Sequence, residues 1–161
     1  MIEVDVLIAG GGPVGLTLSL ELAHYGVNSL VAERNPTTTA TPKMELTNGR
    51  SMELFRRIGV AQDLRFVGVP PENCFDISWV TKLSDHELYR FSYPSAAEGA
   101  RIRLERNDGT LTLEAPLRGS QIVIEPALKQ AAEHSTNVDV RFGWRLESFL
   151  QDDMGVTQQC L

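Results

Sequence analysis

Three glycines near the start of the chain have the spacing of a diphosphate-binding loop. Gly10, Gly12 and Gly15 form the pattern G-x-G-x-x-G directly after an apolar run. In this pattern the first glycine permits a tight turn, the second lets backbone amides approach a pyrophosphate, and the third allows a helix to pack closely on a strand. Free N–H groups at the start of the helix attract the phosphates. The loop therefore predicts a dinucleotide site that also includes Pro13 and Val14.

An acidic residue follows where a ribose ligand is expected. Glu33 comes after Gly15 at roughly the 20-residue distance of this motif, at the end of a second apolar run. A carboxylate there can accept hydrogen bonds from both hydroxyls of an adenosine ribose, whereas it would repel the 2′-phosphate of NADP. FAD and NAD remain as alternatives. The competing interpretations are a glycine turn without a ligand and an exposed strand end at Glu33.

The elements that must position these residues form a βαβ unit. The apolar run 4–9 is typical of a parallel strand buried on both faces. Helical periodicity over 13–25 predicts a helix that Gly26 ends, and 29–32 predicts a second strand that closes with Glu33. The fold class that follows is α/β, with a Rossmann-type nucleotide fold.

The remaining periodicity predicts a departure from this fold and a return to it. Asn48 is a candidate N-cap for a helix through Ile58. We expect a β excursion over residues 70–116, with strands at 77–81, 88–93 and 102–104 and a hairpin turn at 107–109. A helix over 121–134 and strands at 138–142 and 155–161 follow. The abrupt end of the last strand indicates that the chain belongs to a longer protein.

Composition excludes several classes of protein. The net charge is -6, with 15 basic residues scattered among 21 acidic ones, so we expect no nucleic-acid partner. Cys74 and Cys160 lack metal-ligand spacing, and they favour the reducing cytoplasm over an oxidising compartment. The apolar stretch 4–22 has Glu3 and Asp5 at its start in place of a basic leader, so we expect no secretion signal, and its glycines argue against a membrane span. We assign no metal site.

Two further segments resemble one enzyme family. The run from Asn48 to Gly59 is similar to a helix of the FAD-dependent aromatic hydroxylases, the p-hydroxybenzoate hydroxylase-like flavoprotein monooxygenases. The resemblance implies that Arg50 lies over the phosphate and ribitol region of the flavin. The run 118–128 is similar to the family's glutamine-bearing helix, and this resemblance implies that Gln121 contacts the flavin. Arg34 stands where the family also has an arginine, which implies a position near the adenine. A solvent-facing arginine at position 50 or 34 and a helix-opening glutamine are the alternatives.

The resemblance implies a function for a protein longer than this chain. Residues 1–161 would form its N-terminal FAD-binding region, and 70–116 would extend towards the substrate domain, because family members carry later motifs that this sequence lacks. The full enzyme would use NAD(P)H and O₂ to hydroxylate a small aromatic or polyketide-like substrate, and this segment alone would be inactive. No catalytic residue is assigned, since the three histidines are isolated. An NAD-binding dehydrogenase module and a non-catalytic FAD-fold fragment are the alternative functions.

Overall fold

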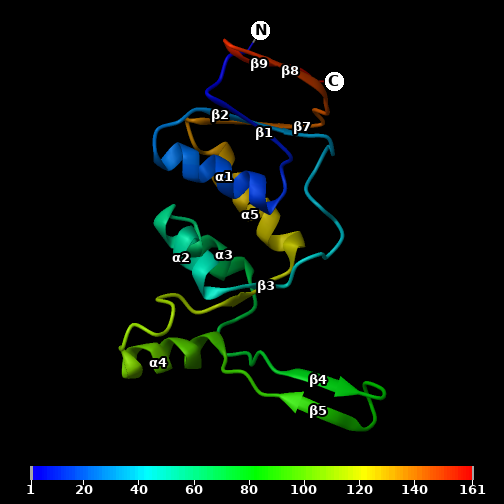
Figure 1. The fold of residues 1–161 in the computed structure, drawn as a ribbon. Coiled ribbons are helices and arrows are strands. Elements are labelled where there is room, and N and C mark those ends of the chain that lie inside the picture. The colour runs from blue at the N-terminus through cyan, green and yellow to red at the C-terminus, as the bar shows by residue number, and fades with distance from the viewer. Residues whose placement is uncertain (1, 161) are drawn as a thin grey trace.

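A parallel sheet and two helices form the centre of the computed structural model, which describes residues 2–160. The sheet has three strands in the order β1-β2-β7. Helices α1 and α5 pack together against one face of this sheet (Figure 1). The bounds are β1 Val6–Ala9, α1 Pro13–His24, β2 Ser29–Glu33, α5 Gln121–Glu133 and β7 Val138–Phe142. The predicted α/β fold and its βαβ unit are confirmed.

The register of the three strands places apolar residues of neighbouring strands side by side, over the helices. Ile8 is opposite Val31, and Val31 is opposite Val140. Val31 is fully buried, as expected for the middle strand of a parallel sheet. The buried core beneath it joins side chains from the sheet and the helices, including Ile8, Leu16, Val31, Met52, Phe55, Leu64, Leu117, Ile124 and Leu128.

A second layer of short elements lies below this core in Figure 1. The predicted helix after Asn48 is α2, Gly49–Arg57, and the Asn48 side chain accepts the N–H of Ser51 at 2.8 Å as its N-cap. The sequence analysis did not predict α3, Ala61–Val67, or the antiparallel pair β3, Leu46–Thr47, and β6, Leu117–Arg118. Both strands of that pair have only two residues, which is too short for a periodic pattern.

The region 70–116 contains a helix as well as strands. The antiparallel strands β4, Ile77–Val80, and β5, Glu87–Phe91, confirm two of the three predicted strands. The predicted strand at 102–104 is wrong, because those residues lie in α4, Ala96–Arg106. Ser95 and Glu98 start this helix by accepting each other's backbone N–H groups in a capping box.

The end of α4 explains a second error. The predicted hairpin turn at 107–109 is wrong, because Asn107 has a φ of 36° and ends the helix in the left-handed conformation. Asn and Gly favour this conformation both in hairpin turns and at helix ends, so the residue types alone do not separate the two.

The chain after β7 forms a hairpin on the side of the sheet away from α1 and α5 (Figure 1). β8, Leu146–Asp152, was not predicted, whereas β9, Gly155–Cys160, confirms the predicted strand, whose last residue, Leu161, lies outside the described residues. Within residues 2–160, no helix combines the length and apolar character needed to cross a membrane.

Candidate functional site

The glycine loop connects the end of β1 to the start of α1, and its geometry requires glycine at two positions. Gly10 has a φ of 116°, and its N–H donates to the carbonyl of Ala32 at 2.8 Å, which fixes the loop to the end of β2. A Cβ on Gly15 would lie 2.0 Å from the Gly10 carbonyl oxygen. Any side chain at position 15 would therefore push α1 away from β1, which is the packing role that the sequence predicted for this glycine.

The start of α1 is open to an anion. Gly12 is the N-cap, no side chain caps the helix, and the first turn carries no acidic residue. A Cβ on Gly12 would meet no heavy atom within 4 Å. Pro13 begins the helix without an N–H group, and Val14 is 84% exposed. Uncapped N–H groups, the helix dipole and open space above Gly12 fit a diphosphate.

Glu33 contacts the glycine loop directly. Its Oε2 accepts the N–H of Gly11 at 2.8 Å, and its Oε1 accepts the backbone N–H of Asn35 at 2.8 Å and its side-chain N–H at 2.6 Å. Partial burial raises the pKa of the Glu33 carboxyl, but the Asn35 and Gly11 donors outweigh it and hold the pKa below its ordinary value. Glu33 is therefore ionised at neutral pH, and both of its oxygens are acceptors for hydrogen bonds from ribose hydroxyls.

Gly11 is a site residue that the sequence analysis overlooked. A Cβ at this position would lie 2.8 Å from the Cβ of Glu33 and 3.0 Å from the Phe142 ring. Only glycine lets the carboxylate of β2 approach the loop backbone so closely. The signal was present in the sequence, because Gly11 lies between the two glycines that were assigned.

The two predicted arginines are exposed. Arg34 follows Glu33 at the end of β2, and its positive charge contributes to the lowered pKa of Glu33. Arg50, in the first turn of α2, has a side chain that is 72% exposed, and one guanidinium nitrogen donates to Oε2 of Glu53 at 2.8 Å. This contact uses one of the five N–H donors of Arg50, so the guanidinium retains donors for a phosphate.

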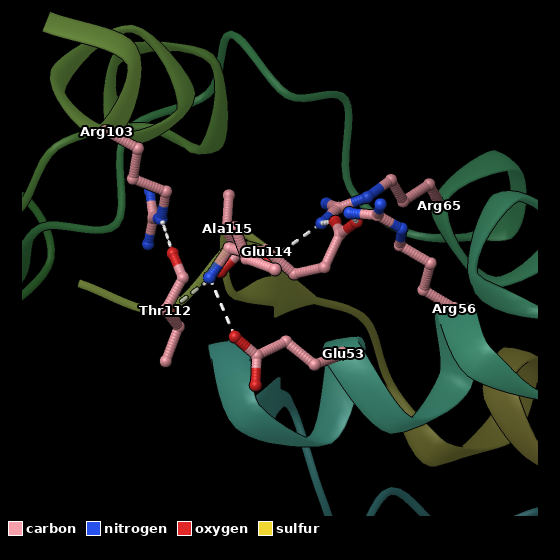
Figure 2. A network of polar contacts seen from close by, with 8 residues as sticks. Glu53, Arg56, Arg65, Arg103, Thr112, Glu114 and Ala115 are labelled. Carbon is pink, nitrogen blue, oxygen red and sulfur yellow. Dashed lines mark hydrogen bonds and ion pairs between the residues drawn. The ribbon is translucent and has the colours of Figure 1, made fainter. Parts of the chain in front are cut away.

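A polar network fixes α2, the helix that carries Arg50, to the segment after α4 (Figure 2). Glu53 accepts the backbone N–H of Leu113 at 2.7 Å through its other oxygen. Glu114 accepts from Arg65 at 2.8 Å and lies 3.4 Å from Arg56. Glu53 of α2 thus binds the segment after α4, and Glu114 of that segment binds Arg56 of α2 and Arg65 of α3, which holds α2 in place beside the core.

Gln121 begins α5 and is buried, with 9% of its surface exposed. Its backbone N–H donates to the carbonyl of Met44 at 2.9 Å, and its side-chain Nε2 donates to Oε2 of Glu125 at 2.7 Å. Glu125 also accepts the N–H of Thr39 at 2.9 Å through Oε1. Sequence reasoning missed Glu125 and Thr39, although Glu125 follows Gln121 by one helical turn, the spacing at which side chains meet.

One stretch of chain, residues 34–45, links the glycine loop and Glu33 to Gln121, and so joins most of the predicted site residues. Residues 34–45 leave the end of β2 and run past the start of α5 (Figure 1), where Thr39 and Met44 bond to Glu125 and Gln121. Glu33 joins this stretch to the glycine loop. In the described part of the chain, Arg50 makes no hydrogen bond to these residues. The arrangement can bind and orient a dinucleotide, and the described residues contain no group of side chains arranged to hold a metal ion.

Comparison with known proteins agrees with this geometry. Residues 3–161 match the model of a family described as FAD binding domain. The chain is 42% identical, over 97% of its length, to the FAD-dependent monooxygenase apdD of Emericella nidulans. It is 33% identical, over 98% of its length, to a 2,4-dichlorophenol 6-monooxygenase of Delftia acidovorans.

A solved structure has the same fold. The flavin-dependent monooxygenase PieE, in complex with FAD and substrate, superposes with a TM-score of 0.85 and 31% sequence identity, over 99% of this chain and 27% of PieE. The chain also spans only about a quarter of the two curated relatives, 25% and 26% of their lengths. The resemblance stated from the two helices is confirmed, and so is FAD, rather than NAD, as the cofactor of the Rossmann-type unit. The chain belongs to the FAD binding domain family of flavin-dependent monooxygenases.

Proposed function

We propose that this chain is the N-terminal FAD-binding region of a monooxygenase that uses NAD(P)H and O₂ to hydroxylate an aromatic or polyketide-like substrate. Relatives with this segment are named as monooxygenases of chlorinated phenols and as aklavinone 12-hydroxylase. Residues 1–161 hold the cofactor, and the remaining parts of the active site come from chain beyond this segment. In this proposal the segment alone is inactive, and the protein works in the cytoplasm.

The observation that carries the proposal is the pairing of the open helix start with Glu33. The N–H groups around Gly12 face an uncapped space, and the ionised carboxylate of Glu33 lies against the same loop. A diphosphate at the helix and a ribose at the carboxylate are adjacent groups of FAD. The three donors already on Glu33 leave one acceptor position on Oε2, and the exposed side chain of Asn35 can turn away to free another.

The other site residues supply orientation and charge. In this proposal Gly10, Gly12, Pro13, Val14 and Gly15 shape the diphosphate site. The ribose is held at the end of β2, with the adenine beside Arg34. Arg50 faces the phosphates and ribitol, and Gln121 contacts the flavin. When bound, FAD supplies the electron and oxygen transfer, and the residues of this chain hold it in position.

The exposed aromatic rings of the 70–116 excursion support a second domain in the full protein. Trp79 and Phe91 lie on the β4–β5 hairpin with ring centroids 5.3 Å apart, and both side chains are exposed. A cluster of exposed aromatic rings on a two-stranded sheet is unstable unless other chain covers it. We propose that the hairpin faces the substrate domain of the full protein.

Purification of the polypeptide that contains this chain, at its natural length, tests the proposed function. We expect visible flavin absorbance, or stoichiometric FAD binding when FAD is added, and no competition by NAD in calorimetry. With FAD bound, phenolic substrates should accelerate NAD(P)H consumption and yield a product one oxygen atom heavier by mass spectrometry. A colourless protein that binds NAD and not FAD would contradict the proposal.

A further inference from the structure

We infer that Glu125 is a positioning residue that holds the side-chain amide of Gln121 in one orientation, with the amide oxygen available to accept a hydrogen bond from bound FAD. The inference rests on the proposed function, because it gives Glu125 a role at the FAD site. Glu125 itself lies behind Gln121 and acts through it.

The first observation is a buried carboxylate without a cationic partner. Glu125 is 5% exposed, and none of the ion pairs among the described residues includes it. Its two oxygens are occupied instead by the N–H of Thr39 and by the amide nitrogen of Gln121. Burying a carboxylate is unfavourable, and a well-packed apolar residue often stabilises a fold equally well. The carboxylate at position 125 is therefore explained by the two hydrogen bonds that it accepts, from Thr39 and from Gln121.

The second observation concerns the direction of the amide. The side-chain nitrogen of Gln121 donates to Oε2 of Glu125, so the nitrogen end of the amide faces the carboxylate. The oxygen end then faces the other way. Within residues 2–160, no protein hydrogen bond uses that oxygen, and it is not among the buried side-chain atoms left unpaired. The amide of Gln121 could by itself present either a donor or an acceptor to FAD. Because Glu125 binds its nitrogen, Gln121 presents its oxygen, an acceptor for the hydroxyl and N–H groups of FAD.

The third observation joins this pair to the rest of the site. The carboxylate that orients Gln121 also holds Thr39, in the stretch that continues from Glu33. The backbone N–H of Gln121 holds Met44 in the same stretch. Glu125 therefore couples the direction of the Gln121 amide to the path of the chain that leaves the ribose site.

The test is Glu125→Gln in the natural-length polypeptide. The new side chain has the same shape, and its oxygen still accepts the Thr39 N–H. Its nitrogen then faces Gln121, whose amide turns over and presents a donor to FAD. One hydrogen bond is lost, so we expect the FAD Kd, measured by fluorescence titration, to rise about two- to tenfold. The unfolding midpoint without FAD should stay close to wild type.

Glu133→Gln is the matched control. Glu133 lies on the same helix, is exposed, and pairs with Lys129 one turn away. The same chemical change there should leave the FAD Kd at the wild-type value. Glu125→Asp is a second variant in case the glutamine variant does not fold. It keeps the charge but shortens the reach to Gln121, and we expect an FAD Kd between wild type and Glu125→Gln.

A double-mutant cycle separates positioning from a general structural role. In a Gln121→Ala background there is no amide to turn, so Glu125→Gln should no longer change the FAD Kd. An effect of equal size in both backgrounds would overturn the inference, since Glu125 would then act through the loop. An unchanged Kd in both Glu125 variants would also overturn it. Wild-type protein that binds no FAD would instead refute the proposed function, and this inference with it.

Discussion

Gly12→Ala and Gly15→Ala each add one methyl group to the glycine loop. The surroundings of the two positions differ. At position 15 the new Cβ would lie 2.0 Å from the carbonyl oxygen of Gly10 and 3.1 Å from Cγ2 of Ile8. The Gly10 oxygen belongs to the backbone and cannot turn aside, so either the loop or α1 must move. At position 12 no heavy atom lies within 4 Å of the new Cβ, and the free protein accommodates it.

These surroundings set the expected magnitudes. Overpacking at Gly15→Ala should lower the free energy of unfolding by about 1–3 kcal/mol. For Gly12→Ala, the reduced entropy of the unfolded chain stabilises by about 0.4–1 kcal/mol, and a poorer N-cap offsets most of that gain. The methyl group at position 12 would occupy the diphosphate space. Loss of one charge-assisted hydrogen bond, about 1.5–3 kcal/mol, should raise the FAD Kd about 10- to 150-fold.

Urea unfolding without FAD and fluorescence titration with FAD measure the two effects separately. Gly12→Ala should unfold like wild type and bind FAD weakly, whereas Gly15→Ala should lose both stability and binding. Wild-type FAD affinity in Gly12→Ala would refute the placement of the diphosphate above this glycine. Equal destabilisation by the two variants would refute the argument from local space.

Three further predictions concern the fold and its dependence on pH. Ser95→Ala removes the hydroxyl that accepts the Glu98 N–H, so it should destabilise the protein by about 1 kcal/mol in urea unfolding; an unchanged midpoint would contradict the capping box. Met52→Ala empties a fully buried position and should cost about 2–5 kcal/mol in the same assay; a near-neutral result would mean that α2 does not pack on the core as described. Because the pKa of Glu33 is lowered in the folded state, its stabilising effect is present above the ordinary glutamate pKa and is lost as pH falls through the folded value. The stability difference between wild type and Glu33→Gln should therefore shrink between about pH 7 and about pH 3, and a difference independent of pH would contradict the ionised contact with Gly11.

Periodicity and the glycine pattern predicted the parts of this fold that form local units. The glycine loop, α1 and β2 follow from apolar spacing, from Pro13 at the first helical position and from Gly26 after the last. Asn48 predicted the start of α2 because an N-cap is a contact between residues three apart. Local signals of this kind are read directly from the sequence.

Periodicity and local motifs do not predict contacts between residues that are far apart in the sequence. The buried pair of Gln121 and Glu125 gains its significance from Thr39, which is far away in sequence. Residues 102–104 were predicted as a strand, whereas the cap at Ser95 and the left-handed Asn107 place them in the helix α4. The hydrogen bond from Gly11 to Glu33 likewise depends on the pairing of β1 with β2, which places the loop against the end of the second strand.

The central claim is that the start of α1 holds the diphosphate of FAD while Glu33 holds the adenosine ribose. A crystal structure of the natural-length polypeptide with FAD tests it most directly. We predict phosphate oxygens within hydrogen-bond distance of the N–H groups that follow Gly12, and ribose hydroxyls on the Glu33 carboxylate, with the Asn35 side chain turned away. FAD bound elsewhere, or a helix start that remains without phosphate in crystals that contain FAD, would contradict the account.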